Sequence, residues 1–165
     1  MHHLDPTSAL ARLFDAPVRP GVVTWIGART ARRQPMAIVQ HATLAVESGL
    51  EGDRYSSSGT RQITLIQDEH LVAIGAYLGT GPVDPALIRR NIVVRGINLL
   101  ALKGRQFQLG TAVLQATGEC HPCSRMEEIF GPGGYNAVRG HGGITARVLT
   151  AGQVQPGDTL RRVTF

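Results

Sequence analysis

The chain of 165 residues carries a formal net charge of +5 and 42% hydrophobic residues, which predicts one globular domain and excludes a wholly disordered protein. No apolar run approaches the ~20 residues of a membrane span, and residues 1–6 lack the apolar core of a secretory signal, so we expect a cytoplasmic protein without membrane contact. Two cysteines are too few for a disulfide framework. Lys103 is the only lysine, so Schiff-base chemistry could rest on no other residue.

The N-terminal residues 1–18 read as an amphipathic leader, because Leu10, Leu13 and Phe14 are spaced as on one face of a short helix. We expect this leader to be either a docking helix or a frayed end, and residues 19–165 to form the domain. Runs rich in apolar and β-branched residues then predict strands at 21–28, 36–40, 62–67, 91–95, 107–109, 113–117, 144–150 and 160–163.

Helix signals are fewer. Asp68 is expected to be the N-cap of a helix that ends near Leu78, and Asp84 followed by Pro85 predicts one further short turn. The 20 glycines and 9 prolines leave little room for long helices. Seven or eight short strands, two or three short helices and no βαβ alternation predict a mainly β (α+β) fold, either a β-barrel or a strongly curved mixed sheet with a few short helices.

The two cysteines lie in the most informative stretch, residues 117–131 (TGECHPCSRMEEIFG). Ser124 and Glu127 match a capping box, which predicts Ser124 as the N-cap of a helix over 125–130. Cys123 would then stand beside the free N–H groups and the positive end of that helix, which favours the thiolate over the thiol. Local chemistry therefore predicts that Cys123 is the more nucleophilic and better-ligating sulfur, with Arg125 adding positive charge.

Four interpretations of this stretch stay open from the residues alone. The cysteines could be a buried and inert pair, which is the usual state of free cysteine. They could form a redox Cys-x-x-Cys similar to that of the thioredoxin family. Cys120 and Cys123 could bind zinc together with His121 and His141. In the fourth interpretation, one thiolate binds a soft metal that a cofactor carries.

Arginines stand at loop positions that could bind an anion. Arg89 and Arg90 lie directly before an apolar strand that begins at Asn91, and Arg54 and Arg61 bracket a polar loop. A guanidinium binds phosphate or carboxylate through two hydrogen bonds, so an anionic ligand would explain these arginines. A compositional bias of the genome would explain the arginine content equally well.

The glycine-rich segment 139–143 (RGHGG) adds Arg139 and His141, and its glycines would let backbone N–H groups approach a phosphate closely. The segment is not a Walker loop, and no G-x-G-x-x-G follows a strand, so nothing indicates nucleotide binding through these motifs. The basic charge would suit nucleic acid, but aromatic residues make up only 5%, too few for a stacking platform. No nucleic-acid partner is expected.

Several short segments, in order along the chain, resemble those of the MOSC domain family, named for the C-terminal domain of molybdenum-cofactor sulfurases. They are residues 49–54 (GLEGDR), 61–66 (RQITLI), 89–94 (RRNIVV), 96–99 (GINL), 120–125 (CHPCSR), 142–144 (GGI) and 157–158 (GD). Their order and spacing carry the resemblance, which runs from about residue 21 to residue 160. It implies a MOSC-type, barrel-like β fold in a small stand-alone member.

The resemblance also implies binding of the molybdenum cofactor, in which molybdopterin holds the metal. The family position that supplies a thiolate to molybdenum falls on Cys123, which makes Cys123 the expected metal ligand and catalytic residue. The family's Arg-x-Asn falls on Arg89 and Asn91, which would hold the pterin and its phosphate. The residues expected to bind the cofactor are Arg54, Arg61, Arg89, Asn91, Ser124, Arg139 and His141.

Three functions follow from the resemblance. The first is a molybdenum-dependent oxidoreductase that reduces N-oxygenated small molecules with a redox partner. The second is a non-enzymatic carrier of persulfide sulfur or cofactor for a molybdoenzyme partner, and the third is a domain that has lost the cofactor. The sequence lacks the pyridoxal-phosphate domain of the sulfurases and the extra N-terminal β-barrel of the amidoxime-reducing relatives. We therefore expect no desulfurase activity and no pyridoxal phosphate.

Overall fold

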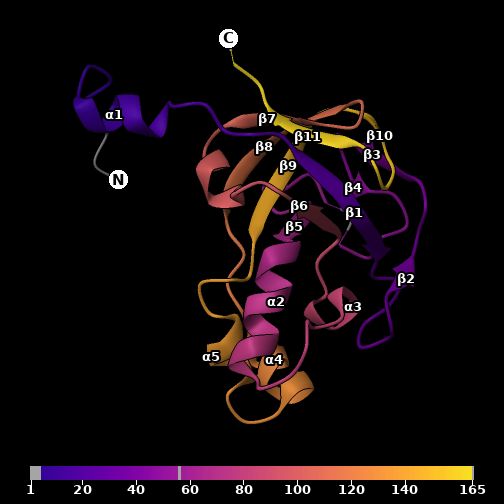
Figure 1. Ribbon diagram of the computed structural model, residues 1–165. Coiled ribbons are helices and arrows are strands. Elements are labelled where there is room, and N and C mark those ends of the chain that lie inside the picture. Colours follow the sequence, from indigo (N-terminus) through magenta and orange to yellow (C-terminus); the bar gives the residue numbers. More distant parts are fainter. Residues whose placement is uncertain (1–4, 56, 165) are drawn as a thin grey trace.

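The computed structural model describes residues 5–55 and 57–164, and its centre is a closed barrel of seven strands (Figure 1). The barrel order is β11-β7-β8-β9-β5-β6-β1, and the pairing of Gly21 with Leu160 joins β1 to β11 and closes the ring. The barrel strands are β1 (Gly21–Ala28), β5 (Ile63–Gln67), β6 (Ile92–Arg95), β7 (Gln106–Leu109), β8 (Ala112–Glu119), β9 (Ile144–Thr150) and β11 (Thr159–Arg162). The predicted mainly β, barrel-like class is confirmed.

Four short strands lie outside the barrel ring. β2 (Ala37–Ile38) extends the sheet beyond β1. A second sheet has the order β10-β3-β4, built from β10 (Gly152–Val154), β3 (Ala42–Ala45) and β4 (Gly49–Leu50). The sequence predicted no strand at β3, β4 or β10, because each is too short to show an apolar alternation.

One pair of barrel strands is parallel, which corrects the expectation that βαβ alternation is absent. β5 and β6 run parallel, with Leu65 opposite Ile92. Their connection contains α2 (Asp68–Tyr77) and α3 (Pro85–Ile88), so it is a helical crossover of the kind that parallel neighbours require. The two helices lie where the signals predicted them and Asp84 caps α3, but the N-cap of α2 is Gln67 and not Asp68. The helices were also not joined to the strands on either side of them.

The remaining helices are α1 (Ala9–Phe14), the 3-10 turn η1 (Leu99–Leu102), α4 (Ser124–Phe130) and α5 (Gly134–Val138). Helices α2, α3, α4 and α5 gather below the barrel in Figure 1, whereas α1 projects from the opposite end. The leader interpretation covered residues 1–18, of which residues 1–4 lie outside the described part; the rest contains α1. No helix in the described chain is long and apolar enough to cross a membrane.

Two hydrophobic cores meet at β5. Ile63 and Leu65 belong to the barrel core, whereas Ile66 belongs to a second core under the helices with Leu71 and Ile74 of α2. All five residues of β5 are therefore buried, including the polar Thr64 and Gln67, so both faces of the strand are covered. The helical layer fixes the loops at this end of the barrel, where the polar residues described below come together.

Candidate functional site

A buried ion pair stands at the base of the candidate site. Arg29 follows β1, and its Nε and Nη2 donate to Asp53 Oδ2 and Oδ1 at 3.0 and 3.1 Å. The backbone N–H of Arg29 also donates to Asp53 Oδ2 at 2.9 Å. Burial alone would raise the pKa of Asp53, but the hydrogen bonds from the Arg29 side chain and backbone outweigh it and lower that pKa.

Asn91 closes this ion pair into a network and is itself completely buried. Its Nδ2 donates to Asp53 Oδ2 at 2.8 Å and to Gly27 O at 3.2 Å, and its Oδ1 accepts from Arg29 Nη2 and from both donors of Thr64. The sequence predicted that Asn91 holds the cofactor. The structure places its side chain beneath the site, with its donors and acceptor used inside the chain, so Asn91 supports the residues that face outward.

Arg89 lies near enough to three other arginines for their charges to act on it. Burial is the main cause that lowers the pKa of Arg89, and the charges of Arg125, Arg29 and Arg54 lower it further. Arg89 terminates α3 in the left-handed conformation (φ 60°), and its Nη1 donates to Gln34 O at 2.8 Å. Like charges brought close together are costly unless an anion joins them, so this arginine cluster (Arg29, Arg54, Arg89 and Arg125) favours a negatively charged ligand.

Tyr55 packs two of these arginines on its ring. The guanidinium carbon of Arg29 lies 4.4 Å from the ring centroid and that of Arg54 lies 4.9 Å from it. The Tyr55 N–H also donates to Asp53 Oδ1 at 2.9 Å, which ties the ring position to the buried ion pair. An aromatic face attracts both cations and holds them close together.

Acidic side chains only partly balance the cluster. Asp53 pairs with Arg29, and Glu128 accepts from Arg125 Nη1 at 2.8 Å and lies 3.4 Å from Arg33 Nη1. Within residues 5–55 and 57–164, no carboxylate forms an ion pair with Arg54 or Arg89. These two guanidiniums therefore have charge available for a ligand.

The cysteine segment leaves one sulfur buried and the other exposed. Cys120 is 5% exposed, whereas Cys123 is exposed at the start of α4, and both are free thiols. The N-cap of α4 is Cys123 and not Ser124, because Cys123 O already accepts from Met126 N at 2.9 Å. The capping-box prediction is wrong in its second half as well, since Glu127 instead accepts from Gly133 N and Tyr135 N, both at 2.8 Å, ahead of and within α5.

Arg90 fixes the cysteine segment against the glycine-rich segment. Its guanidinium is buried and donates to Gly142 O at 2.7 Å, Ile88 O at 3.0 Å and Cys120 O at 3.2 Å. Burial lowers the pKa of Arg90, whereas the neighbouring Cys120 opposes that shift. Arg90 thus connects the α3–β6 junction to the cysteines, a role that sequence reasoning did not assign to it.

Two of the three glycines of segment 139–143 are explained by packing. A Cβ on Gly142 would lie 2.1 Å from Cys120 O, and a Cβ on Gly143 would lie 1.9 Å from Leu65 O. Gly143 also has a φ of 83°, a conformation that favours glycine. These two glycines therefore let the segment lie against β5 and the cysteines, which is a different reason from the expected approach to a phosphate.

His141 lies on the side of this segment that faces α2. Its ring centroid is 4.8 Å from that of His70 and 5.3 Å from that of Tyr77. The Nδ1 atoms of both histidines are buried without a hydrogen-bond partner in the described chain. His141 also lines a cavity of about 240 Å³ with Cys120 and His121, a cavity whose lining includes neither Arg54 nor Arg89.

The remaining expected residues are exposed. Arg61 and Arg139 are solvent-exposed, and Ser124 is exposed as the first residue of α4. Arg61 lies near enough to Arg90 for its charge to lower the pKa of Arg90 slightly, after burial and the other neighbours. Of the predicted cofactor-binding residues, the structure thus brings Arg54 and Arg89 into one cluster, and Arg125 of the cysteine segment lies with them.

A zinc site built from protein ligands alone is not assembled. Among the described residues, no group of three or more histidine, cysteine, aspartate or glutamate side chains comes together in an arrangement that could hold a metal ion. The zinc interpretation of Cys120, His121, Cys123 and His141 is therefore wrong. A metal that is already held by a cofactor needs fewer ligands from the protein, and one exposed thiolate is sufficient.

Sequence reasoning missed Arg29 and Tyr55. Arg29 directly follows the apolar strand β1, and a long basic side chain at such a junction was the available signal. Tyr55 carries no motif, and its role emerges only when the loop after β4 brings its ring against two guanidiniums.

Comparison with solved structures shows the same fold in two bacterial proteins. The YuaD protein of Bacillus subtilis has a TM-score of 0.78 at 18% identity, covering 90% of this chain and 98% of that one. YiiM of Geobacillus stearothermophilus has a TM-score of 0.72 at 20% identity, covering 87% of this chain and 75% of that one. Identities this low show the fold alone.

The family follows from the sequence itself. No curated protein matches the chain. The family model described as the MOSC domain matches residues 51–161, which include Arg54, Arg89 and both cysteines and span most of the chain. The chain therefore belongs to the MOSC domain family, a family associated with molybdenum-cofactor binding.

Proposed function

We propose that the protein binds the molybdenum cofactor at the arginine cluster, with Cys123 as the thiolate ligand to molybdenum. The proposal is carried by Arg29 and Arg54, which pack on one tyrosine ring, and by Arg89 and Arg125, whose charges act together with theirs. Arg54 and Arg89 have no acidic partner in the described chain, and the neighbouring segment has Cys123 as its one exposed sulfur. A ligand that carries both a phosphate and a metal could bind the guanidiniums and the Cys123 sulfur at the same time.

The residues present fit this group on chemical grounds. Arg54 and Arg89 would hold the phosphate of the pterin, because a guanidinium donates two parallel hydrogen bonds to such an oxyanion. Cys123 would supply a soft thiolate to molybdenum. Asp53, Asn91 and Tyr55 would act indirectly by holding Arg29 and Arg54 in position. When bound, the cofactor supplies two-electron redox chemistry.

The reaction that suits such a site is the reduction of an N-oxygenated small molecule. A hydroxylamine, R–NHOH, takes up two electrons and two protons to give the amine R–NH2 and water. The electrons would come from a protein redox partner. The arginine cluster would keep the cofactor in place while the exposed position of Cys123 leaves the metal open to a small substrate.

A second function is favoured by the contrast between the two sulfurs. Because Cys123 is exposed and Cys120 is buried, a protein partner could reach one sulfur only. A carrier that holds a persulfide on Cys123, or hands cofactor to a molybdoenzyme, needs this single accessible thiol. Sulfane sulfur on protein that contains no molybdenum would favour the carrier over the oxidoreductase.

The experiment is metal and pterin analysis of protein purified from a host that makes the cofactor. We expect molybdenum near one atom per chain in the wild type and a loss of at least about tenfold in Arg89→Lys, which keeps the charge but loses the two-pronged hydrogen bond. Arg95→Lys is the matched control, because Arg95 lies at the exposed end of β6 and pairs with Asp68. Equal molybdenum in all three proteins would contradict the assignment of Arg89.

A further inference from the structure

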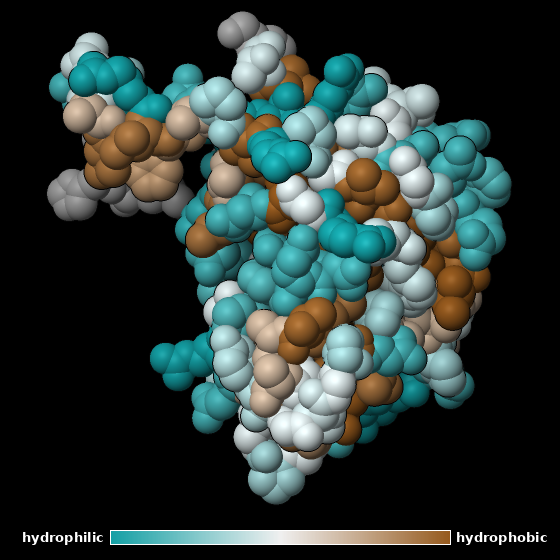
Figure 2. All heavy atoms as spheres, in the orientation of Figure 1, coloured by the Kyte–Doolittle hydropathy of each residue, from teal (hydrophilic) through white to brown (hydrophobic). Residues whose placement is uncertain are grey.

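Helix α1 presents an apolar face that is exposed in the described part of the chain. Leu10, Leu13 and Phe14 are 48%, 73% and 59% exposed, and no residue of α1 is buried. The helix stands away from the barrel, and Figure 2 shows its apolar side chains gathered on that projection. A helix this short is marginal in water without a partner surface, so its apolar face calls for one.

The end of α1 is nevertheless firmly attached to the barrel. The Asp15 carboxylate pairs with Arg162 of β11 and lies 3.4 Å from Arg105 Nη1, and Arg162 Nη1 also donates to Asp15 O at 3.2 Å. These contacts fix the point at which α1 leaves the body. The helix therefore projects in a defined place.

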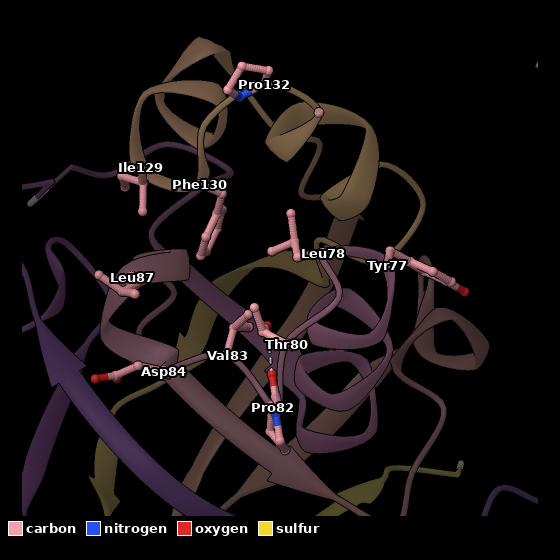
Figure 3. A pocket seen from close by; sticks show the side chains of 12 residues that line it. Tyr77, Leu78, Thr80, Pro82, Val83, Asp84, Leu87, Ile129, Phe130 and Pro132 are labelled. Atoms are coloured by element: carbon pink, nitrogen blue, oxygen red, sulfur yellow. Dashed lines mark hydrogen bonds between the residues drawn. The ribbon is translucent and has the colours of Figure 1, made fainter.

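A matching hollow lies at the opposite end of the molecule. A cavity of about 560 Å³ opens between the end of α2, α3 and α4, and the side chains of Leu78, Val83, Leu87, Ile129 and Phe130 surround it (Figure 3). Leu87 is 45% exposed there. These five side chains are apolar and suit the apolar face of an amphipathic helix, while polar atoms make up about half of the surface of the hollow.

The two surfaces also match in charge. Arg12 is the one charged residue within α1, and Asp84 is the one charged residue among those that line the hollow. A single six-residue helix would cover too little surface, since stable interfaces bury about 1,200–2,000 Å². Two such contacts related by a two-fold axis double the buried area, which favours a mutual exchange.

We propose that two copies of this chain form a two-fold dimer in which α1 of each copy docks into the hollow between α2, α3 and α4 of the other. The helix cannot reach the hollow of its own chain, because Asp15 is held at β11 and α1 projects from the end of the barrel opposite to α2 and α4 (Figure 1). This inference is independent of the proposed cofactor site, since neither Leu13 nor Leu87 belongs to the arginine cluster.

The test is the molar mass in solution, measured by light scattering and by sedimentation over a range of concentrations. We expect a dimer for the wild type and at least about a tenfold weaker association for Leu13→Glu on the helix and for Leu87→Glu in the hollow. Val46→Glu is the control, because Val46 is 41% exposed and belongs to neither surface. Both test positions are exposed, so melting curves should show that folding is kept.

A mixing experiment distinguishes this exchange from any other dimer. The Leu13→Glu chain keeps an intact hollow and the Leu87→Glu chain keeps an intact helix, so an equimolar mixture can form one of the two contacts. We expect the mixture to associate more strongly than either variant alone. A wild type that stays monomeric at about 100 µM, well above the dissociation constants of most specific complexes, would overturn the proposal. A Leu13→Glu dimer as stable as the wild-type dimer would overturn it as well.

Discussion

The buried amide of Asn91 joins both members of one ion pair, since its Nδ2 donates to Asp53 Oδ2 at 2.8 Å and its Oδ1 accepts from Arg29 Nη2 at 2.9 Å. A charged pair with little solvent depends on such hydrogen bonds to offset the cost of burial. The arginine cluster depends on this network, because Arg29 is held by Asp53 and Asn91 and also packs on the ring of Tyr55.

Asp53→Asn should lower the free energy of unfolding by about 3–5 kcal/mol at neutral pH, because it leaves the Arg29 charge buried without its partner. The exposed Asp68, which lies 3.6 Å from Arg95, is the matched control, and Asp68→Asn should cost less than about 1 kcal/mol. Urea unfolding of the three proteins measures both effects. Equal losses in the two variants would contradict the assigned role of Asp53.

The ion pair of Arg29 and Asp53 should also make the free energy of unfolding depend on pH in the acid range. The pKa of Asp53 is lowered in the folded protein, so its contribution is fully present above the ordinary aspartate value of about 3.9 and is lost as pH falls through the lowered value. The wild type should therefore lose stability over that range more steeply than Asp53→Asn. Parallel stability profiles between pH 5 and pH 2 would show that another group is responsible.

Protonation of His70 should destabilise the folded protein, whereas protonation of a salt-bridged histidine stabilises it. Burial, followed by the charge of His141, lowers the pKa of His70. Between that lowered value and the ordinary value of about 6.5, the unfolded chain binds more protons than the folded one, so stability falls as pH falls through this window. His70→Gln should flatten the profile of unfolding free energy from pH 7 downward. A variant that keeps the wild-type slope would contradict this cause.

The sequence predicted most of the barrel, and the reasons for the exceptions are physical. β1, β9 and α3 with its Asp84 cap lie where the patterns placed them. β3 and β10 were missed because each is too short to show a pattern of its own, and only the fold reveals their pairing, with Leu44 opposite Gly152. Local pattern carries no information about such a partner.

The candidate site was predicted in part for the same reason. Local patterns placed Cys123 at the start of a helix and Arg89 before a strand, and both positions are observed. Whether an arginine joins a cluster depends on three-dimensional neighbours, so the roles of Arg29 and Arg90 became visible only in the fold. Asn91 was assigned to the cofactor from the family resemblance, and its complete burial is visible only in the fold.

Gly142 should be intolerant of any side chain. A Cβ there would lie 2.1 Å from Cys120 O, so Gly142→Ala must displace the cysteine segment from the glycine-rich segment. We expect a loss of at least about 2 kcal/mol in unfolding free energy, since overpacking typically costs 1–3 kcal/mol. Gly81→Ala is the control, because nothing lies within 4 Å of its Cβ position. Similar melting temperatures for the two variants would contradict the close contact.

The two cysteines should react at different rates with an alkylating reagent. Cys120 is 5% exposed and Cys123 is exposed, so Cys123 should be modified well before Cys120 in the folded protein. Peptide mass spectrometry after short incubations separates the two sites. In denaturant the difference should shrink, and faster labelling of Cys120 in the folded state would contradict the structure of this segment.

Molybdenum content of Cys123→Ser and Cys120→Ser, purified beside the wild type from a cofactor-producing host, tests the central claim most directly. A molybdenum site that carries its own pterin sulfurs needs one protein thiolate, so we expect Cys123→Ser to lose the metal and Cys120→Ser to keep most of it. Serine is nearly isosteric but a harder ligand, and similar melting curves should show that both variants fold. Equal molybdenum in both variants and the wild type, or equal loss in both variants, would contradict the assignment of Cys123.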